Sequence, residues 1–341
     1  MAQELTPVKG CSTNAANDTL QCKEPHPVTN DARSAAVLFP GQGSQEKGMG
    51  RDLAEASSDA MDLWKQAEGL SGLALREIYW DGDDAAMADT RNLQPAMTVT
   101  TLNLWFALKG RLAPMGMAGH SLGEYAALAA SGALAVRDVL ELVCLRGRLM
   151  AEAGGSDGAM AAILKVSLED VERIVARAAE AVGGTLIVAN YNTPGQYVIS
   201  GRKDAVDQAA GLCKEVKGRA IPLAVSGAFH SPMMAEAAAE LAKVLAKADW
   251  RAPSVPVYPN VSGAAQSDPA RLLELATRQM TSSVRWIDTM AAMYQDGARA
   301  FVEIGPKGVL TKMVAANLPG KDDLKALNVA TAEAAEHFTL G

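Results

Sequence analysis

The sequence of 341 residues is poor in several features that mark other classes of protein. It contains no apolar run long enough to cross a membrane as a helix. Its 39 acidic residues outnumber its 32 basic ones, and the net charge of −7 argues against bulk attraction to nucleic acid or to an anionic membrane. The four cysteines have no metal-ligand spacing, so we expect reduced thiols, no bound metal and a cytoplasmic location.

The N-terminal segment also lacks the features of a folded or targeting segment. Residues 1–33 are rich in Thr, Asn, Asp and Pro, and their few apolar residues show no periodicity. They contain no apolar core of the kind that a signal peptide needs. We therefore expect residues 1–33 to form a flexible N-terminal tail.

The rest of the chain has the composition and rhythm of a globular protein. Hydrophobic residues make up 49% of the whole sequence and charged residues 21%. Short apolar segments that suit buried strands alternate with longer segments of helical periodicity. A strand is predicted over 35–39, and helices over 92–109 and 137–153. Pro95 and Gly110 lie where the start and end of the first of these helices favour them.

The pattern changes after GGSDG, a predicted linker over 154–158. The next segments predict, in order, strand 159–165, helix 167–182, strand 185–190, strand 196–200, helix 203–217 and strand 219–225. This βαββαβ order is that of a ferredoxin-like unit. We therefore predict an α/β fold with four parts: a large α/β subdomain over 34–154 and 225–320, an inserted small subdomain over 155–224, the N-terminal tail, and a C-terminal tail over 321–341.

One serine lies between two glycines, in the sequence GHSLG over 119–123. The pattern G-x-S-x-G is the nucleophile elbow, a sharp strand-to-helix turn with the serine hydroxyl at its apex. The free N–H groups and the dipole of the following helix would face a developing oxyanion. The alternative is a glycine-rich turn that contains serine by chance. A predicted strand before it and an alanine-rich helix after it favour Ser121 as a nucleophile.

A serine nucleophile needs a base, and the sequence offers four histidines. His26 lies in the predicted tail and His337 near the far end of the chain. His120 neighbours Ser121, and side chains of adjacent residues diverge at an elbow, so we interpret it as a packed histidine. His230 lies in a loop with Gly and Pro, and it is the candidate general base against the alternative of a surface histidine.

Arg146 stands out by its position on the helix predicted over 137–153. Helical spacing places it in two apolar rows, which contain Val139, Val143, Met150, Leu142 and Leu149. A guanidinium on an apolar face needs an anion. That anion is either an internal Asp or Glu, or a substrate carboxylate held by two parallel hydrogen bonds.

The turn after the first strand, PGQGSQ, is also rich in glycine. Gln42 in this turn could donate its backbone N–H to an oxyanion, beside the backbone N–H of Leu122. A glycine-rich loop can also bind phosphate, but this one matches neither a P-loop nor a dinucleotide fingerprint. Gln42 and Leu122 are therefore candidate oxyanion donors.

Six motifs, taken in their order along the chain, resemble those of the malonyl-CoA:acyl carrier protein transacylases. They are PGQGSQ, GHSLGEY, CLRGRLM, VANYNTPGQYVISG, GAFHSP and EIGPKGVL, and the likeness runs from about Val37 to Leu310. The phenylalanine in GAFHSP is similar to that of malonyl-selective acyltransferase domains of polyketide synthases. Both fatty acid synthesis and polyketide synthesis are therefore open as the biological context.

The resemblance implies an α/β-hydrolase-like large subdomain, a ferredoxin-like insertion and a ping-pong reaction. Ser121 would take the malonyl group from malonyl-CoA with His230 as base. The phosphopantetheine thiol of acyl carrier protein would then attack the malonyl-serine ester. By motif position, Arg146 would grip the malonyl carboxylate and the main-chain carbonyl of Gln279 would orient His230. The resemblance implies neither a third acidic residue nor a bound cofactor.

Two other functions compete with this one. A serine thioesterase or esterase would use the same elbow, although a buried Arg146 argues against simple esters. A non-catalytic module that binds carrier protein is disfavoured because Ser121 and His230 are both present. Dependence of turnover on a thiol acceptor separates the transferase from the hydrolase.

A carrier protein of this family is acidic, and so is this chain, so a local basic surface is needed for docking. The sequence of the small subdomain offers one cluster, made of Arg202, Lys203, Lys214, Lys217 and Arg219. We predict that this cluster docks the carrier, against the alternative of an ordinary solvated surface.

Overall fold

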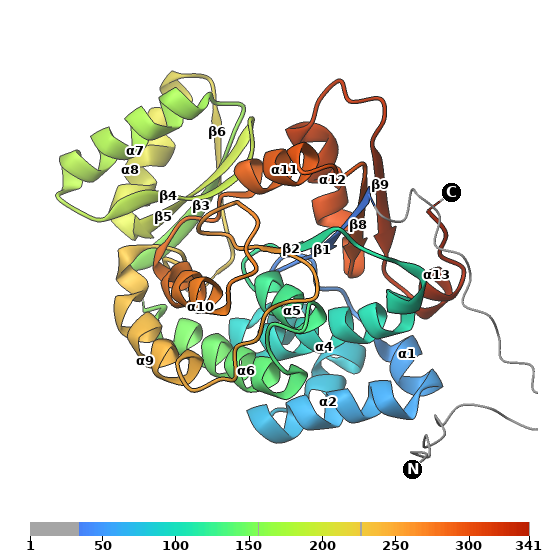
Figure 1. Cartoon of the computed structure of the whole chain (residues 1–341). Helices are drawn as coiled ribbons and strands as arrows, with labels where there is room; N and C mark the ends of the chain where they lie inside the picture. The colour runs from blue at the N-terminus through green and yellow to red at the C-terminus, as the bar shows by residue number, and fades with distance from the viewer. Residues whose placement is uncertain (1–33, 156, 226, 341) are drawn as a thin grey trace, which may run out of the picture.

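Two β-sheets form the framework of the protein (Figure 1). The structure is a computed structural model that describes residues 34–155, 157–225 and 227–340. One sheet has five parallel strands in the order β7-β2-β1-β8-β9. The other has four antiparallel strands in the order β4-β5-β3-β6. The tail predicted over 1–33 lies outside the described residues.

The parallel sheet is buried on both faces. Its strands are β1 (Ala35–Phe39), β2 (Gly116–Gly119), β7 (Val257–Tyr258), β8 (Ala300–Ile304) and β9 (Lys325–Val329). All five residues of β1 are buried, as a continuous apolar segment predicts for a parallel strand covered on both faces. Its side chains alternate between two cores: Val37 and Phe39 belong to one, and Ala36 and Leu38 to the other.

Helices cover both faces of this sheet (Figure 1). The core that contains Val37 also takes residues from α1 (Arg51–Ala56), α2 (Ser58–Ser71), α3 (Asp84–Ala88), α4 (Thr90–Leu108), α5 (Gly123–Ala130), α6 (Val136–Ala153), α9 (Ala235–Leu245) and α10 (Pro269–Arg278). The core that contains Leu38 takes residues from α11 (Trp286–Gln295) and α12 (Val309–Asn317). This arrangement confirms the predicted α/β class and places the carboxyl ends of the strands at one edge of the sheet.

The helix ends follow from local chemistry. Asp89 precedes α4 and accepts a hydrogen bond from the backbone N–H of Arg91, which satisfies a free donor of the first turn. Pro95 lies in the second turn of this helix, where it removes the hydrogen bond that an N–H at this position would donate to the carbonyl oxygen of Arg91. The predictions over 92–109 and 137–153 therefore differ from α4 and α6 by at most two residues at each end.

The inserted unit has the predicted βαββαβ order. It consists of β3 (Gly158–Leu164), α7 (Leu168–Val182), β4 (Leu186–Thr193), β5 (Gln196–Arg202), α8 (Lys203–Glu215) and β6 (Arg219–Pro222). Both helices pack on one face of its sheet and form a separate core with Ile163 and Ile199. Met160, Ala162 and Val198 lie on the other face and join the main core. The subdomain limits at 155 and 224 stay predictions, because the regular elements begin and end inside them.

The C-terminal tail predicted over 321–341 is wrong. β9 lies there and pairs in parallel with β8, and it is followed by α13 (Ala332–Glu336). The backbone N–H of Ala332 donates to Asp52 Oδ2 at 2.6 Å, and Ala335 is fully buried. The segment looked loose in the sequence because β9 is an edge strand, and among its five residues only Val329 is buried.

Three further predictions concern absences. Among the described residues, no helix is long and apolar enough to cross a membrane. The same part of the chain contains no cluster of three or more His, Cys, Asp or Glu side chains that could hold a metal ion. Cys144 and Cys213 are free thiols. Cys11 and Cys22 lie outside the described residues.

Candidate active site

Ser121 lies at a sharp turn between β2 and α5. Its φ of 50° is in the left-handed region, which is strained for a residue with a side chain. A Cβ at Gly119 would lie 1.9 Å from the carbonyl carbon of Gly123. A Cβ at Gly123 would lie 2.0 Å from the carbonyl oxygen of Phe39. Both glycines are therefore required by close backbone approach, and together they present the serine hydroxyl at the carboxyl edge of the parallel sheet.

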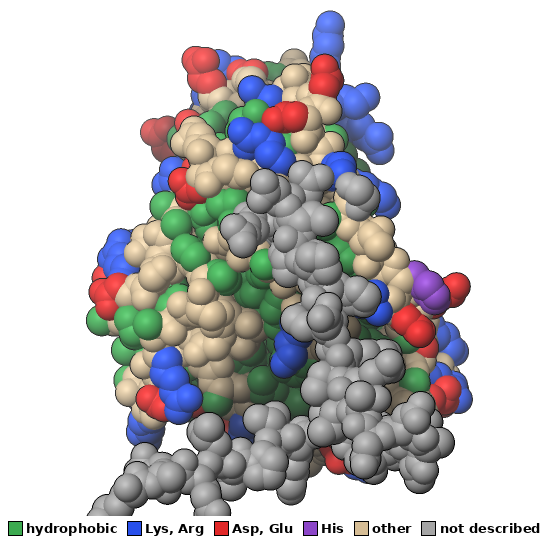
Figure 2. All heavy atoms as spheres, turned by 45° about the vertical axis from the view of Figure 1, so that its right-hand side comes forward, with side chains coloured by type: hydrophobic (Ala, Val, Ile, Leu, Met, Phe, Trp, Pro, Cys, Tyr) green, Lys and Arg blue, Asp and Glu red, His purple; other side chains and the backbone are tan. Residues whose placement is uncertain are grey.

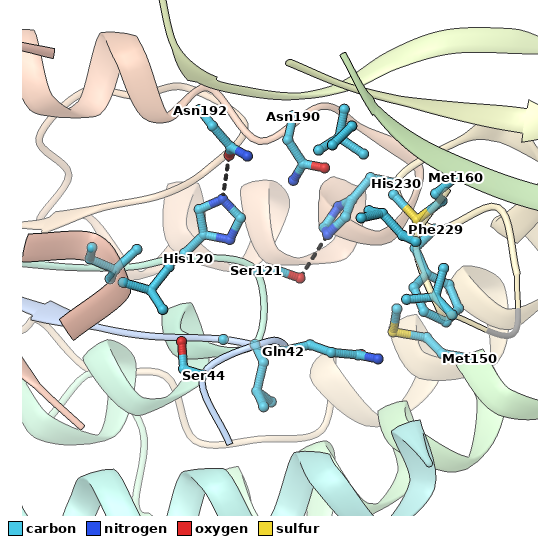
Figure 3. Close-up of a pocket in the computed structure, with 18 of the residues that line it drawn as sticks. Gln42, Ser44, His120, Ser121, Met150, Met160, Asn190, Asn192, Phe229 and His230 are labelled. Carbon is cyan, nitrogen blue, oxygen red and sulfur yellow. Dashed lines mark hydrogen bonds between the residues drawn. The ribbon is translucent and has the colours of Figure 1, made fainter. Parts of the chain in front are cut away.

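His230 is in direct contact with this hydroxyl (Figure 3). Its Nε2 lies 2.7 Å from Ser121 Oγ. Its Nδ1 lies 3.0 Å from the carbonyl oxygen of Gln279 and 3.2 Å from that of Ser282. Carbonyl oxygens only accept hydrogen bonds, so Nδ1 carries the proton and Nε2 is free to accept one from serine.

The surroundings of His230 keep its imidazole neutral. The residue is 3% exposed, and burial lowers its pKa from 6.5 to about 3, with help from the positive charge of Arg146. The two carbonyl contacts act in the opposite direction. The predicted main-chain carbonyl of Gln279 is thus in contact with the histidine, and it comes from a short 3₁₀ turn over Gln279–Thr281.

Arg146 reaches the same point from α6, although it is 1% exposed. Its guanidinium donates to Gln94 Oε1 at 2.9 Å, to Gln279 Oε1 at 3.1 Å and to Ser121 Oγ at 3.1 Å. The guanidinium carbon also lies 5.4 Å from the centre of the Tyr125 ring. Neutral amides and an aromatic face therefore contact the cation directly, while the buried carboxylate of Glu124 acts on it only at longer range.

The internal ion pair that the sequence left open for Arg146 is absent from the described part of the chain, where no carboxylate lies within 4 Å of its guanidinium. Its Nε is buried without a hydrogen-bond partner among those residues. Burial is the largest cause that lowers the guanidinium pKa, but an arginine remains charged in a protein. A buried cation with spare donors thus lies beside the serine hydroxyl.

Gln42 and Leu122 lie on the two loops that meet at the elbow. A Cβ at Gly41 would lie 2.4 Å from the carbonyl oxygen of His120 and 3.6 Å from the backbone nitrogen of Leu122, so the loop after β1 packs closely against the turn. The side-chain amide of Gln42 contacts Thr90 Oγ1 at 3.2 Å. Among backbone contacts of the described residues, neither Gln42 N–H nor Leu122 N–H donates a hydrogen bond. Both donors are available to an oxygen atom.

A cavity of about 240 Å³ lies between the two sheets and is lined by Ser121, His230, Arg146, Gln42 and Leu122. One wall comes from the parallel-sheet side, and the opposite wall from the antiparallel sheet, including Met160 and Asn190. Asn190 is 5% exposed, and Figure 3 shows its amide directed into the cavity. His120 Nε2 contacts Asn192 Oδ1 at 2.8 Å, away from Ser121, and its ring packs edge-on against Trp286. It is a packed histidine at the cavity wall, as the sequence suggested.

Gln94 and Asn190 are site residues that the sequence alone did not indicate. Gln94 follows a predicted helix start and has no motif of its own. Asn190 and Asn192 alternate along β4, which places both on one face of the strand. Two amides on the inner face of a strand that begins with four apolar residues are a signal that could have indicated a polar cavity wall.

Known proteins share both the sequence pattern and this architecture. A family model described as an acyl transferase domain matches residues 37–336. The malonyl CoA-acyl carrier protein transacylase of Bacillus subtilis is 40% identical over 282 residues, which is 82% of this chain and 89% of that protein. The enzyme of the same name from Haemophilus influenzae is 38% identical over 309 residues, or 89% of this chain and 98% of that protein.

Solved structures agree with these relatives. An acyl carrier protein S-malonyltransferase from Vibrio cholerae superposes with a TM-score of 0.82 at 37% identity, covering 87% of this chain and 97% of that one. A malonyl-transacylase in complex with a type II polyketide synthase acyl carrier protein superposes with a TM-score of 0.83 at 35% identity, covering 89% of this chain and 98% of that chain.

Proposed function

We propose a specific reaction for this chain, which belongs to the acyl transferase family: transfer of malonyl from malonyl-CoA to the phosphopantetheine thiol of acyl carrier protein. One observation carries the choice of acyl group. The buried Arg146 guanidinium lies 3.1 Å from Ser121 Oγ, and no carboxylate of the described residues is paired with it. An acyl group with a terminal carboxylate completes this site, whereas an acetyl group leaves it open.

In the first half-reaction, His230 Nε2 takes the proton of Ser121 as Oγ attacks the thioester carbonyl carbon. The carbonyl oxygen becomes negative and is met by the backbone N–H groups of Leu122 and Gln42. The C–S bond then breaks, the coenzyme A sulfur receives the proton from His230, and a malonyl-serine ester remains. Arg146 holds the malonyl carboxylate throughout and thereby orients the carbonyl.

In the second half-reaction, His230 takes the proton of the phosphopantetheine thiol, and the sulfur attacks the ester carbonyl. The same two N–H groups stabilise the second tetrahedral intermediate. Collapse releases Ser121, which recovers its proton from His230. The main-chain carbonyl of Gln279 fixes the imidazole in the tautomer that both steps need.

These groups complete both half-reactions on malonyl-CoA as substrate, so the proposed mechanism uses no bound cofactor or metal. We assign the reaction to the cytoplasm from the sparse cysteines of the sequence. Fatty acid synthesis is the context we favour, because the curated relatives are malonyl CoA-acyl carrier protein transacylases. A polyketide carrier is the second candidate, because one similar structure is a transacylase bound to such a carrier.

The proposal is tested by intact-mass measurement. Incubation with malonyl-CoA should add one malonyl group to the parent protein and none to Ser121→Ala. Addition of the phosphopantetheinylated carrier should then remove the group and place it on the carrier thiol. Loss of the adduct to free malonate at the same rate without carrier would instead identify a thioesterase or esterase.

A further inference from the structure

Asn260 lies in the loop after β7, outside the cavity, and is 1% exposed. All of its side-chain bonds are made to the elbow. Its Oδ1 accepts a hydrogen bond from the backbone N–H of Ser121 at 2.7 Å, and its Nδ2 donates to the carbonyl oxygen of Gly119 at 2.7 Å. Its own backbone N–H donates to Glu124 Oε2 at 2.7 Å.

The Asn260 side chain makes hydrogen bonds to the chain of β2 beyond the last backbone pair of the sheet. β2 and β7 pair in parallel as far as Ala118 and Tyr258. Beyond this pair the chain of β2 bends into the elbow, and the ladder between the two strands ends. The Asn260 amide offers one acceptor and one donor, as a peptide group does, and it bridges residues on both sides of the His120 peptide.

We propose that Asn260 is a positioning residue for the nucleophile, which it holds by fixing the backbone of the elbow. Ser121 occupies a strained left-handed conformation, and such strain persists only where the surroundings over-determine it. Two hydrogen bonds of 2.7 Å to the buried amide contribute to that constraint, together with the Gln279 side-chain amide, which donates to the carbonyl oxygen of Ser121 at 3.0 Å. Glu124, 2% exposed in the first turn of α5, holds Asn260 in turn. The inference rests on the proposed role of Ser121.

A second consequence concerns the oxyanion. The backbone N–H of Ser121 is occupied by Asn260 and is not available to substrate. The developing charge therefore has the N–H groups of Leu122 and Gln42 as its partners. Asn260 thus contributes to the position of the attacking oxygen and keeps the Ser121 amide from serving the oxyanion.

The test compares Asn260→Ala with Asn103→Ala. Asn103 is also a buried asparagine, 5% exposed, and its amide donates to the carbonyl oxygen of Ala60 at 3.0 Å, away from the cavity. We expect Asn260→Ala to lower the single-turnover rate of acylation by malonyl-CoA at least about tenfold, because small misplacements of a nucleophile are costly. The KM for malonyl-CoA should stay within about twofold, since Arg146 is untouched.

Asn103→Ala should acylate at the parent rate at any temperature where circular dichroism shows it folded. If both variants lose stability and both acylate at the parent rate, Asn260 is structural only and the inference is overturned. If the parent itself forms no malonyl adduct, the proposed function fails and the positioning role fails with it. The two failures are therefore distinguishable.

A measurement on the parent protein keeps the inference testable if Asn260→Ala does not fold. Amide hydrogen exchange of Ser121 should be slower than that of Leu122 by at least about tenfold, because only Ser121 N–H is bonded. Residue burial alone predicts the reverse order, since Leu122 is buried and Ser121 is half-buried. Exchange of Ser121 as fast as that of Leu122 would show that the Asn260 bond does not hold the elbow.

Discussion

At the scale of single residues, the charge of His230 decides whether the site can act as a base. Burial is the main reason that its pKa falls to about 3, and the Arg146 charge adds to it. The neutral form accepts the Ser121 proton, so activity is present above the pKa and is lost as pH falls through it. A malonyl carboxylate on Arg146 offsets the cationic charge, which makes the imidazole more basic when substrate is bound.

The pH profile of acylation follows from this. We expect kcat/KM for malonyl-CoA to stay level well below pH 6.5, the ordinary pKa of histidine, because the free enzyme holds His230 neutral. Arg146→Ala should move the acid limb to higher pH, since it removes one cause of the lowered pKa. Values of kcat/KM between about pH 4 and pH 8, with thermal melts alongside, provide the check. An acid limb at 6.5 in the parent would contradict the account.

Some residues of the site can be predicted from the sequence and others cannot. Ser121 is found by its motif, and Arg146 by its place in two apolar rows of a helix. Gln94 and Asn260 are ordinary amides, distant from the elbow along the chain, and only the fold brings them to it. The place of Gln279 followed from family resemblance alone, because no periodicity distinguishes a residue that acts through its main-chain carbonyl.

At the scale of secondary-structure elements, close backbone approach constrains the place where β1, β2 and α5 meet. Gly123 begins α5 where its backbone lies against the carbonyl group of Phe39 at the end of β1. Any side chain there pushes the helix from the sheet, and the helix start carries the Leu122 N–H. Packing and oxyanion geometry are therefore coupled at this residue.

Gly123→Ala should consequently destabilise the protein by at least about 2 kcal/mol, because the added methyl group overlaps backbone that cannot move aside. Gly69→Ala in α2 is the matched control. A Cβ at Gly69 meets no heavy atom within 4 Å, so this change should stabilise by about 0.5–1 kcal/mol. Urea unfolding of both variants provides the comparison. Equal stability of the two would contradict the close approach at Gly123.

Element boundaries were predictable where burial is strong. The strand over 35–39 matches β1 because every residue in it is buried. The strand predicted over 185–190 stops short of β4, which continues to Thr193 through two irregularities in pairing. β9 was missed because an edge strand that is mostly exposed carries little apolar pattern.

At the scale of the whole molecule, the cavity exists only because the two sheets face one another. Arg146 and the elbow belong to the parallel-sheet part, and Met160 and Asn190 to the inserted unit. The surface outside the cavity carries both signs of charge. Figure 2 shows basic and acidic side chains intermingled over one face of the molecule.

Ion pairs reduce the net positive charge of the predicted docking cluster. Arg202 forms an ion pair with Asp204, and Lys203 Nζ lies 3.3 Å from the carboxylate of Asp207. The positive charges of Arg202 and Lys203 are therefore partly neutralised. Lys214, Lys217 and Arg219 are exposed and form no ion pair among the described residues. The cluster stays a prediction, now centred on these three residues.

Reversing the charges of Lys217 and Arg219 to Glu should raise the KM for an acidic carrier at least about threefold at low salt, because rim charges act mainly on encounter. The acylation rate with malonyl-CoA should not change, since both residues lie outside the cavity. Steady-state kinetics at two salt concentrations provide the measurement. Unchanged carrier kinetics at low salt would indicate an ordinary solvated surface.

The corrected C-terminus gives a prediction on stability. Truncation after Leu324 removes β9 and α13 and exposes the edge of β8. It also removes the buried side chains of Val329 and Ala335 and so exposes the core residues that they cover. The melting temperature should fall by several degrees or the protein should aggregate. Deletion of residues 1–33, which lack apolar periodicity, is the control and should leave it nearly unchanged. A truncated protein as stable as the parent would show that the last strand contributes nothing.

The ratio of kcat/KM for malonyl-CoA to that for acetyl-CoA tests most directly whether Arg146 selects a malonyl group beside Ser121. Arg146→Ala should lower kcat/KM for malonyl-CoA at least about tenfold, since it leaves the carboxylate buried without a partner. Transfer of acetyl should hold steady or rise, and Arg146→Lys should recover only part of the malonyl rate. Arg148→Ala, an exposed arginine on the same helix, should change neither substrate. Equal losses for malonyl and acetyl in Arg146→Ala would mean that the guanidinium supports the fold rather than the substrate, and the account would be wrong.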